Sequence, residues 1–119
     1  MARIIVVDDS DFIKDSLCKI LVDNGHTVVA KASNGDQAFT MYETSKPDLV
    51  TIDITMPVTD GISAIKNIIQ HYPEARIVVI SAVTRKELVF EALVSGAKQY
   101  VFKPFSSQNI LDAVNKALA

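Results

Sequence analysis

The sequence of 119 residues lacks tryptophan and contains a single cysteine, Cys18. One cysteine excludes an internal disulfide framework and a cysteine-rich zinc site, so Cys18 is interpreted as a small apolar residue of a helix. Glycine and proline are scarce, at four residues each, which excludes collagen-like and low-complexity chains. No apolar run is long enough to span a membrane. We therefore expect a globular protein without membrane contact.

An excess of charge of one sign is also missing. Twelve lysines and arginines against 14 acidic residues give a formal net charge of -2. Because affinity for nucleic acid rests mainly on basic side chains that neutralise phosphates, direct nucleic-acid binding is not expected. The chain begins with a strand-like segment rather than with a charged and then apolar leader, which predicts a cytoplasmic protein. The length fits one domain, residues 1–119.

Short apolar segments alternate with helical periodicities five times along the chain. We expect strands near residues 3–8, 27–32, 49–53, 77–81 and 99–102, and helices near residues 11–24, 35–45, 61–71, 84–95 and 107–118. Segments 4–7 and 77–80 are continuously apolar and β-branched, which is typical of parallel strands covered on both faces. Right-handed crossovers then favour an α/β fold: a doubly wound (βα)5 arrangement with a five-stranded parallel sheet in the flavodoxin-like order 2-1-3-4-5.

Acidic residues stand at the ends of two predicted strands. Asp8 and Asp9 end or follow the first strand, and Asp53 closes the third. In the order 2-1-3-4-5 these strands are neighbours, so the three carboxylates meet in the crevice at the carboxyl edge of the sheet. Converging carboxylates repel one another unless a cation neutralises them. The sequence therefore predicts a site for a hard divalent cation, Mg²⁺ in the first place and Mn²⁺ as the alternative.

Two more polar residues are expected at the same edge. Ser81 ends the fourth strand, and Lys103 follows the fifth. A carboxylate with a metal ion and an amine beside it suits a nucleophile that accepts a phosphoryl group, because the cations offset the charge repulsion. We interpret Asp53 as this nucleophile. Lys103 would pair with it, and the Ser81 hydroxyl would donate to a phosphoryl oxygen.

Each of these residues also has a purely structural interpretation. Asp8 and Asp9 suit the turn before a helix, although Ser10 or Asp11 already fills the capping role. Lys103, taken alone, suits a solvated surface lysine. A purely structural interpretation leaves unexplained why acid, hydroxyl and amine are predicted at one edge, so the functional interpretation is preferred.

In order and spacing these motifs resemble the receiver domains of two-component response regulators, and among them the single-domain, CheY-like chemotaxis type. The resemblance covers essentially the whole chain. It rests on Asp8-Asp9, on Asp53-Ile54-Thr55-Met56-Pro57 followed by Asp60-Gly61, on Ser81-Ala82 and on Lys103-Pro104-Phe105.

The resemblance implies that Asp53 is phosphorylated by a histidine kinase or a phosphotransfer protein. It implies that Asp9, Asp53 and the backbone carbonyl of Thr55 ligate Mg²⁺, with Asp8 acting mainly through bound water. Lys103 matches the active-site lysine of the family. The chain would catalyse its own phosphorylation and slow dephosphorylation, without turnover as an enzyme.

The resemblance also implies a switch. Ser81 matches the switch hydroxyl and Tyr100 the aromatic switch residue. Movement of Ser81 toward a phosphoryl group would leave space for the Tyr100 ring. The surface of the fourth helix, fifth strand and fifth helix would then change and bind a downstream protein, such as a flagellar motor switch or another effector. A monomer is expected.

Thr55 and Val83 occupy the two positions that often set the phosphoryl lifetime in this family. Neither side chain offers a carboxylate or amide to orient water. We therefore expect slow self-dephosphorylation unless an external phosphatase supplies such a group.

Two alternatives remain open at this point. One is a receiver that is part of a longer regulator with a DNA-binding or enzymatic output domain. The other is a small Mg²⁺-dependent phosphohydrolase of the haloacid dehalogenase type with Asp53 as nucleophile. That family places a second Asp two residues after the nucleophile, where this chain has Thr55.

Overall fold

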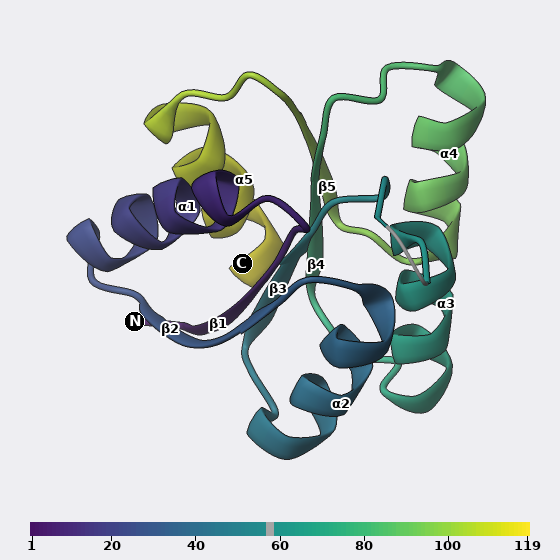
Figure 1. The fold of residues 1–119 in the computed structure, drawn as a ribbon, viewed down its shortest axis with the longest axis horizontal. Helices are drawn as coiled ribbons and strands as arrows, with labels where there is room; N and C mark the ends of the chain where they lie inside the picture. Colours follow the sequence, from purple (N-terminus) through teal and green to yellow (C-terminus); the bar gives the residue numbers. More distant parts are fainter. Residues whose placement is uncertain (57–58) are drawn as a thin grey trace.

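The computed structural model describes residues 1–56 and 59–119. Strands and helices alternate along the chain (Figure 1). The strands are β1 (Arg3–Val7), β2 (Thr27–Ala32), β3 (Leu49–Ile52), β4 (Ile77–Ser81) and β5 (Gln99–Phe102). The helices are α1 (Asp11–Asp23), α2 (Gly35–Ser45), α3 (Gly61–His71), α4 (Lys86–Ser95) and α5 (Ser107–Leu118). Every predicted element is present, with boundaries within two residues of those expected from the sequence.

All five strands are parallel and lie in the order β2-β1-β3-β4-β5, as predicted. The strands are therefore added on one side of β1 first (β2) and then on its other side (β3, β4 and β5). As a result β1 and β3 are hydrogen-bonded neighbours, with Val7 opposite Ile52. Directly beyond this pair, the N–H of Asp53 donates to the carbonyl of Val7 at 3.1 Å. The strand order thus brings the residues that follow β1 and β3 to one point of the carboxyl edge.

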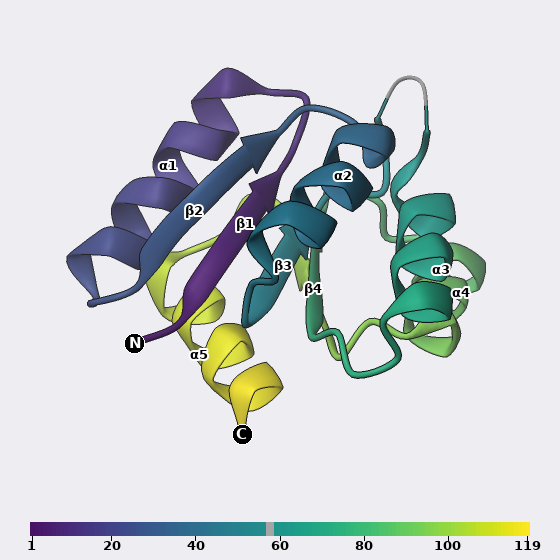
Figure 2. The ribbon, with the colours of Figure 1, turned by 90° about the horizontal axis from the view of Figure 1, so that it is seen from below.

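Helices cover both faces of the sheet (Figure 2). Helices α1 and α5 pack on one face, and α2, α3 and α4 lie on the other. Strands β3 and β4 are buried along their whole length, and β1 is buried after Arg3. Burial on both faces explains why residues 4–7 of β1 and 77–80 of β4 are continuously apolar rather than alternating.

Four helices begin at side-chain caps, and α4 does not. Ser10, Asn34, Asp60 and Ser106 each accept a hydrogen bond from a backbone N–H of the first turn. Helix α4 follows Arg85, which makes no side-chain cap bond. Helix α4 begins two residues after the start expected near residue 84. In the loop before it, the backbone of Val83 is bonded to the side chains of Ser81 and Tyr100.

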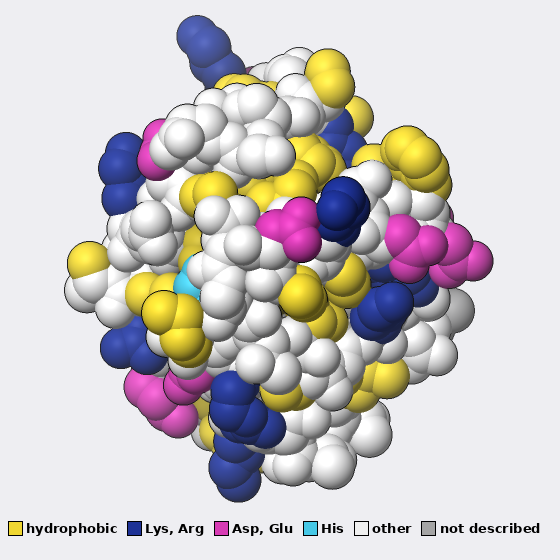
Figure 3. Space-filling model, turned by 90° about the vertical axis from the view of Figure 1, so that its left-hand side faces the viewer, with side chains coloured by type: hydrophobic (Ala, Val, Ile, Leu, Met, Phe, Trp, Pro, Cys, Tyr) yellow, Lys and Arg dark blue, Asp and Glu magenta, His cyan; other side chains and the backbone are white. Residues whose placement is uncertain are grey.

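The surface carries both signs of charge. On the face in Figure 3, basic and acidic side chains lie interspersed among hydrophobic ones, in keeping with the formal net charge of -2. Across residues 1–56 and 59–119, no helix has both the length and the hydrophobicity needed to cross a bilayer.

One polar side chain lies in the core without a hydrogen bond. Thr51 of β3 is fully buried, and its hydroxyl has no partner within the described part of the chain. Its strand neighbours are Val6 and Val78, which belong to the core beneath α1 and α5. A buried hydroxyl that has left water without finding a partner lowers stability.

We expect Thr51→Val to raise the free energy of unfolding by about 1 kcal/mol, because it replaces the hydroxyl with a methyl group of similar size. Urea denaturation followed by circular dichroism measures this change. Thr27→Val, at the exposed start of β2, is the matched control and should change stability by less than about 0.5 kcal/mol. A Thr51→Val protein less stable than the wild type would show that the hydroxyl is satisfied in solution.

Candidate functional site

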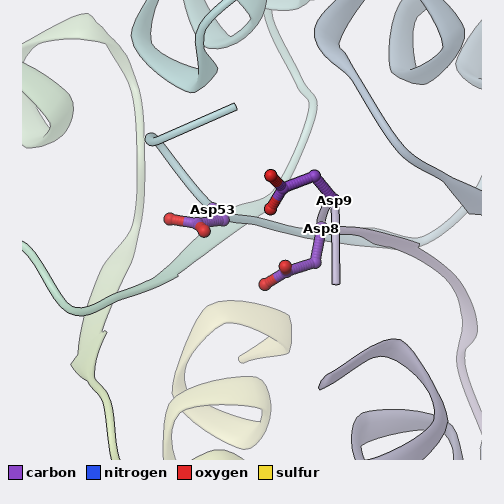
Figure 4. A group of neighbouring side chains, drawn as sticks. All are labelled: Asp8, Asp9 and Asp53. Atoms are coloured by element: carbon purple, nitrogen blue, oxygen red, sulfur yellow. The ribbon is translucent and has the colours of Figure 1, made fainter. Parts of the chain in front are cut away.

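Three carboxylates converge at the carboxyl edge of the sheet. Asp8 and Asp9 follow β1 and Asp53 follows β3. One oxygen from each lies within 4.8 Å of the others (Figure 4). Asp8 and Asp53 are 1% and 6% exposed, whereas Asp9 is exposed to solvent. The structure thus brings together the three acids that the predicted strand order places side by side.

Lys103 joins this cluster from the end of β5. Its Nζ donates to Oδ2 of Asp8 at 2.8 Å and to Oδ2 of Asp53 at 3.2 Å. Its own N–H donates to the carbonyl of Ser81 at 2.9 Å, which ties the end of β5 to the end of β4. The sequence predicted the pairing with Asp53 and missed the shorter bond to Asp8. No local pattern in the sequence indicates that bond, since the two residues are 95 positions apart.

The ammonium group of Lys103 is held in its charged form. Burial by itself would lower the pKa of Lys103, but the hydrogen bond to Asp8 and the negative charges of Asp53 and Asp8 outweigh it. The pKa therefore lies above the ordinary value for lysine. At neutral pH the site holds a permanent cation between two buried carboxylates, and this cation offsets part of their mutual repulsion.

Backbone amides hold the other oxygens of the same two carboxylates. Oδ1 of Asp53 accepts a hydrogen bond from the N–H of Thr55 at 3.1 Å. Oδ1 of Asp8 accepts one from the N–H of Ser10 at 2.9 Å. Each carboxylate thus turns one oxygen to the chain that follows its strand and the other to Lys103. This shared arrangement holds both side chains in a defined orientation.

Gly61 lets α3 begin against the end of β3. Its N–H donates to the carbonyl of Ile54 at 3.1 Å, and a Cβ at this position would lie 2.3 Å from the carbonyl oxygen of Asp53. Asp60 caps the helix by accepting from the N–H of Ser63 at 2.9 Å, so the Asp60-Gly61 pair of the motif forms the start of α3. Pro57, part of the motif that follows Asp53, lies outside the described residues.

Ser81 and Tyr100 meet at the backbone of one loop residue. The buried Ser81 Oγ accepts from the N–H of Val83 at 3.1 Å, and the Tyr100 hydroxyl donates to the Val83 carbonyl at 2.7 Å. No hydrogen bond joins Ser81 to Asp53 within the part of the chain that the structure describes. The sequence singled out Val83 for its side chain and missed that its backbone links Ser81 to Tyr100.

Tyr100 is half-buried, with its ring centroid 5.2 Å from that of Phe102. Burial, together with the negative charge of Asp53, raises the pKa of its phenol above the ordinary value for tyrosine. The hydroxyl therefore stays protonated and can donate to the loop.

The donor set of the acidic cluster fits a hard divalent cation. Asp8, Asp9 and Asp53 supply carboxylate oxygens, the ligands that Mg²⁺ and Mn²⁺ prefer over nitrogen or sulfur. Two of the three are already oriented by backbone N–H groups. The residues present therefore fit the predicted metal ion.

The chain is similar to known proteins over nearly its whole length. Residues 4–115 match the family described as the response regulator receiver domain. The chain is 47% identical over 116 residues to the chemotaxis protein CheY of Bacillus subtilis, a match that covers 98% of this chain and 97% of that protein. It is 42% identical over 114 residues to CheY of Thermotoga maritima, covering 96% and 95% of the two chains.

Solved structures show the same likeness. The chain superposes with a TM-score of 0.95 on a chain of the CheX-CheY-BeF3-Mg²⁺ complex from Borrelia burgdorferi. The two are 34% identical, and the match covers 98% of this chain and 89% of that chain.

Proposed function

Because the chain belongs to the family of response regulator receiver domains, we propose that it works as a phospho-accepting switch with Asp53 as the acceptor. The observation that carries this proposal is the position of Lys103, whose Nζ is hydrogen-bonded to both Asp8 and Asp53. A buried strand-end carboxylate with a fixed cation beside it is prepared for the negative charge of an incoming phosphoryl group.

The phosphoryl donor is a phosphohistidine of a histidine kinase or a phosphotransfer protein. A carboxylate oxygen of Asp53 attacks the phosphorus atom, so a P–O bond forms while the P–N bond to histidine breaks. The electron pair of that bond stays on the imidazole nitrogen, which takes a proton from solvent. The product is an acyl phosphate on Asp53, and Lys103 remains within reach to pair with its oxygens.

Asp9 and Asp53 are the direct carboxylate ligands proposed for Mg²⁺, together with the backbone carbonyl of Thr55, while Asp8 acts mainly through water. Bound Mg²⁺ supplies positive charge that offsets the charge of the carboxylates and of the phosphoryl oxygens. The bonds from Ser10 and Thr55 keep Asp8 and Asp53 turned toward the cluster before any metal arrives.

The proposed switch runs through the loop after β4. A phosphoryl oxygen on Asp53 attracts the Ser81 hydroxyl, which now accepts from the N–H of Val83. Movement of Ser81 therefore alters Val83, whose carbonyl holds the Tyr100 hydroxyl. Helix α4 directly follows this loop and lacks a side-chain cap, so its start is free to respond. Phosphorylation needs only to favour one of two arrangements that already exist.

The output surface proposed is that of α4, β5 and α5. It exposes large hydrophobic side chains, with Phe90 and Val94 on α4 and Phe102 on β5 exposed at 69%, 68% and 49%. Such side chains on a soluble domain suit a protein partner. By linkage, a partner that prefers the phosphorylated arrangement also favours phosphorylation.

The likeness to CheY proteins supports a role in chemotaxis, with a motor switch or another effector as the target. The solved complex pairs CheX with a CheY, so a protein partner is also proposed for this chain. An external phosphatase is proposed on separate grounds, since the side chains of Thr55 and Val83 offer no group to orient water. A monomer is proposed. The alternative output is a DNA-binding or enzymatic domain in a longer regulator of which this receiver is part.

The phosphohydrolase alternative is not favoured. The chain matches the receiver family over residues 4–115, and Thr55 stands where a haloacid dehalogenase has its second Asp. A receiver is labelled once and then signals, whereas a phosphohydrolase turns over many substrates.

Incubation with acetyl phosphate and Mg²⁺ should add one phosphoryl group to the wild type and none to Asp53→Asn, because the amide cannot act as the nucleophile. Intact-protein mass spectrometry measures the label. Asp60→Asn is the matched control, since asparagine caps a helix as well as aspartate does, and it should be labelled like the wild type. Equal labelling of the wild type and Asp53→Asn would remove Asp53 from the proposal.

The phosphoryl group of the wild type should outlast that of Thr55→Asn. An amide at position 55 can orient water for in-line attack, and a hydrogen bond worth about 1 kcal/mol in the transition state corresponds to roughly fivefold in rate. Loss of the phosphorylated mass after removal of the donor, with Mg²⁺ present, gives both lifetimes. Thr44→Asn, in α2, should leave the lifetime unchanged. A wild-type lifetime as short as that of Thr55→Asn would show that the chain orients water by another group.

A further inference from the structure

In the segment between β3 and α3, described residues near both ends are held by hydrogen bonds. Near β3, the N–H of Gly61 closes it by donating to the carbonyl of Ile54 at 3.1 Å. Near α3, Thr59 is bonded to the start of α2. The N–H of Gly35 donates to the Thr59 carbonyl at 3.2 Å, and the Thr59 hydroxyl donates to Oδ1 of Asp36 at 2.6 Å. Figure 2 shows the start of α2 beside the chain that leads into α3.

The contact between α2 and this loop is close. Gly35 is buried, and a Cβ at its position would lie 2.8 Å from both the carbonyl oxygen and Cγ2 of Thr59. Any side chain at position 35 would therefore push Thr59 away. Both hydrogen bonds of Thr59, the one to the Gly35 N–H and the one to the Asp36 carboxylate, require that Thr59 lie this close to the start of α2.

The Asp36 carboxylate is well placed to hold the hydroxyl of Thr59. Asp36 lies in the first turn of α2, where the helix dipole favours a negative charge. A hydroxyl that donates to a carboxylate makes a shorter and stronger hydrogen bond than one between neutral groups. Since Asp36 is exposed, we expect a moderate effect rather than a large one.

We propose that Asp36 and Thr59 are positioning residues for the phosphoryl-accepting site, because Thr59 leads into Gly61, whose N–H holds the Ile54 carbonyl beside Thr55. This proposal rests on the function proposed above. The loop carries Thr55, whose N–H bonds to Asp53 and whose carbonyl is a proposed ligand of Mg²⁺. If Thr55 is already held in place, metal binding costs less conformational entropy, so the affinity of the site for the metal is higher.

The test compares the Mg²⁺ affinity of four variants by isothermal titration calorimetry. Thr59→Val removes the hydroxyl and keeps the shape of the side chain, and Asp36→Ala removes the acceptor. Each should raise the Kd for Mg²⁺ about threefold to tenfold. The Kd of the double variant should not exceed the higher Kd of the two single variants, because the hydrogen bond between Thr59 and Asp36 can be lost only once. Thr59→Ser, which keeps the hydroxyl, should bind like the wild type.

Thr44→Val is the matched control. It removes a threonine hydroxyl from α2, where that group donates to the Thr40 carbonyl at 3.0 Å, and it should leave the Kd unchanged. Hydrogen exchange at the Gly35 amide is the second measurement. This amide should exchange faster in Thr59→Val and Asp36→Ala, whether or not Mg²⁺ is present. A purely structural role would lower the urea midpoint without changing the Kd of the folded protein.

Unchanged Mg²⁺ affinity in both Thr59→Val and Asp36→Ala would overturn the proposal, as would a Thr59→Ser protein that binds as weakly as Thr59→Val. Labelling of Asp53→Asn by acetyl phosphate would instead refute the proposed function. These two failures can be told apart, because calorimetry measures only the binding of Mg²⁺, whereas mass spectrometry measures only the transfer of the phosphoryl group.

Discussion

The carboxylates of Asp8 and Asp53 lie buried at the edge of the sheet with the ammonium of Lys103 hydrogen-bonded to both. Two buried carboxylates side by side are unfavourable unless a cation accompanies them, so the fold must place the Lys103 ammonium beside them. The order of the strands achieves this. β1 and β3 are neighbours, and the end of β5 is tied to the end of β4. The same strand order that brings the two carboxylates together therefore also brings the ammonium group that offsets their repulsion.

Loops connect this site to the rest of the molecule in two directions. After β3, the chain is bonded to Asp53 at Thr55 and to α2 at Thr59. After β4, Ser81 and Tyr100 are joined through Val83. We infer that the first connection holds the metal-binding side in place, whereas the second carries a change at Asp53 to α4. In the proposed mechanism, the sheet positions Asp53 and its neighbours, and the loops at its edge transmit the effect of phosphorylation.

The strands, their order and the grouping of the acids were predictable from the sequence. Buried parallel strands have continuous apolar sequences, and once β1 and β3 are neighbours Asp8 and Asp53 must meet. The start of α4 was missed because no capping side chain marks it. The bond from Lys103 to Asp8 and the bond from Thr59 to Asp36 join residues far apart in sequence. No local pattern indicates such pairs, because the tertiary structure decides which oxygen each donor reaches.

In the proposed mechanism, this edge of the sheet accepts a phosphoryl group on Asp53. Treating the phosphorylated wild type with sodium borohydride reduces an acyl phosphate to the corresponding alcohol, which turns the modified aspartate into homoserine. Peptide mass spectrometry then locates it. We expect homoserine at position 53 alone, in an amount that matches the phosphoryl label. Reduction at Asp8 or Asp9, or a stable label without any homoserine, would contradict it.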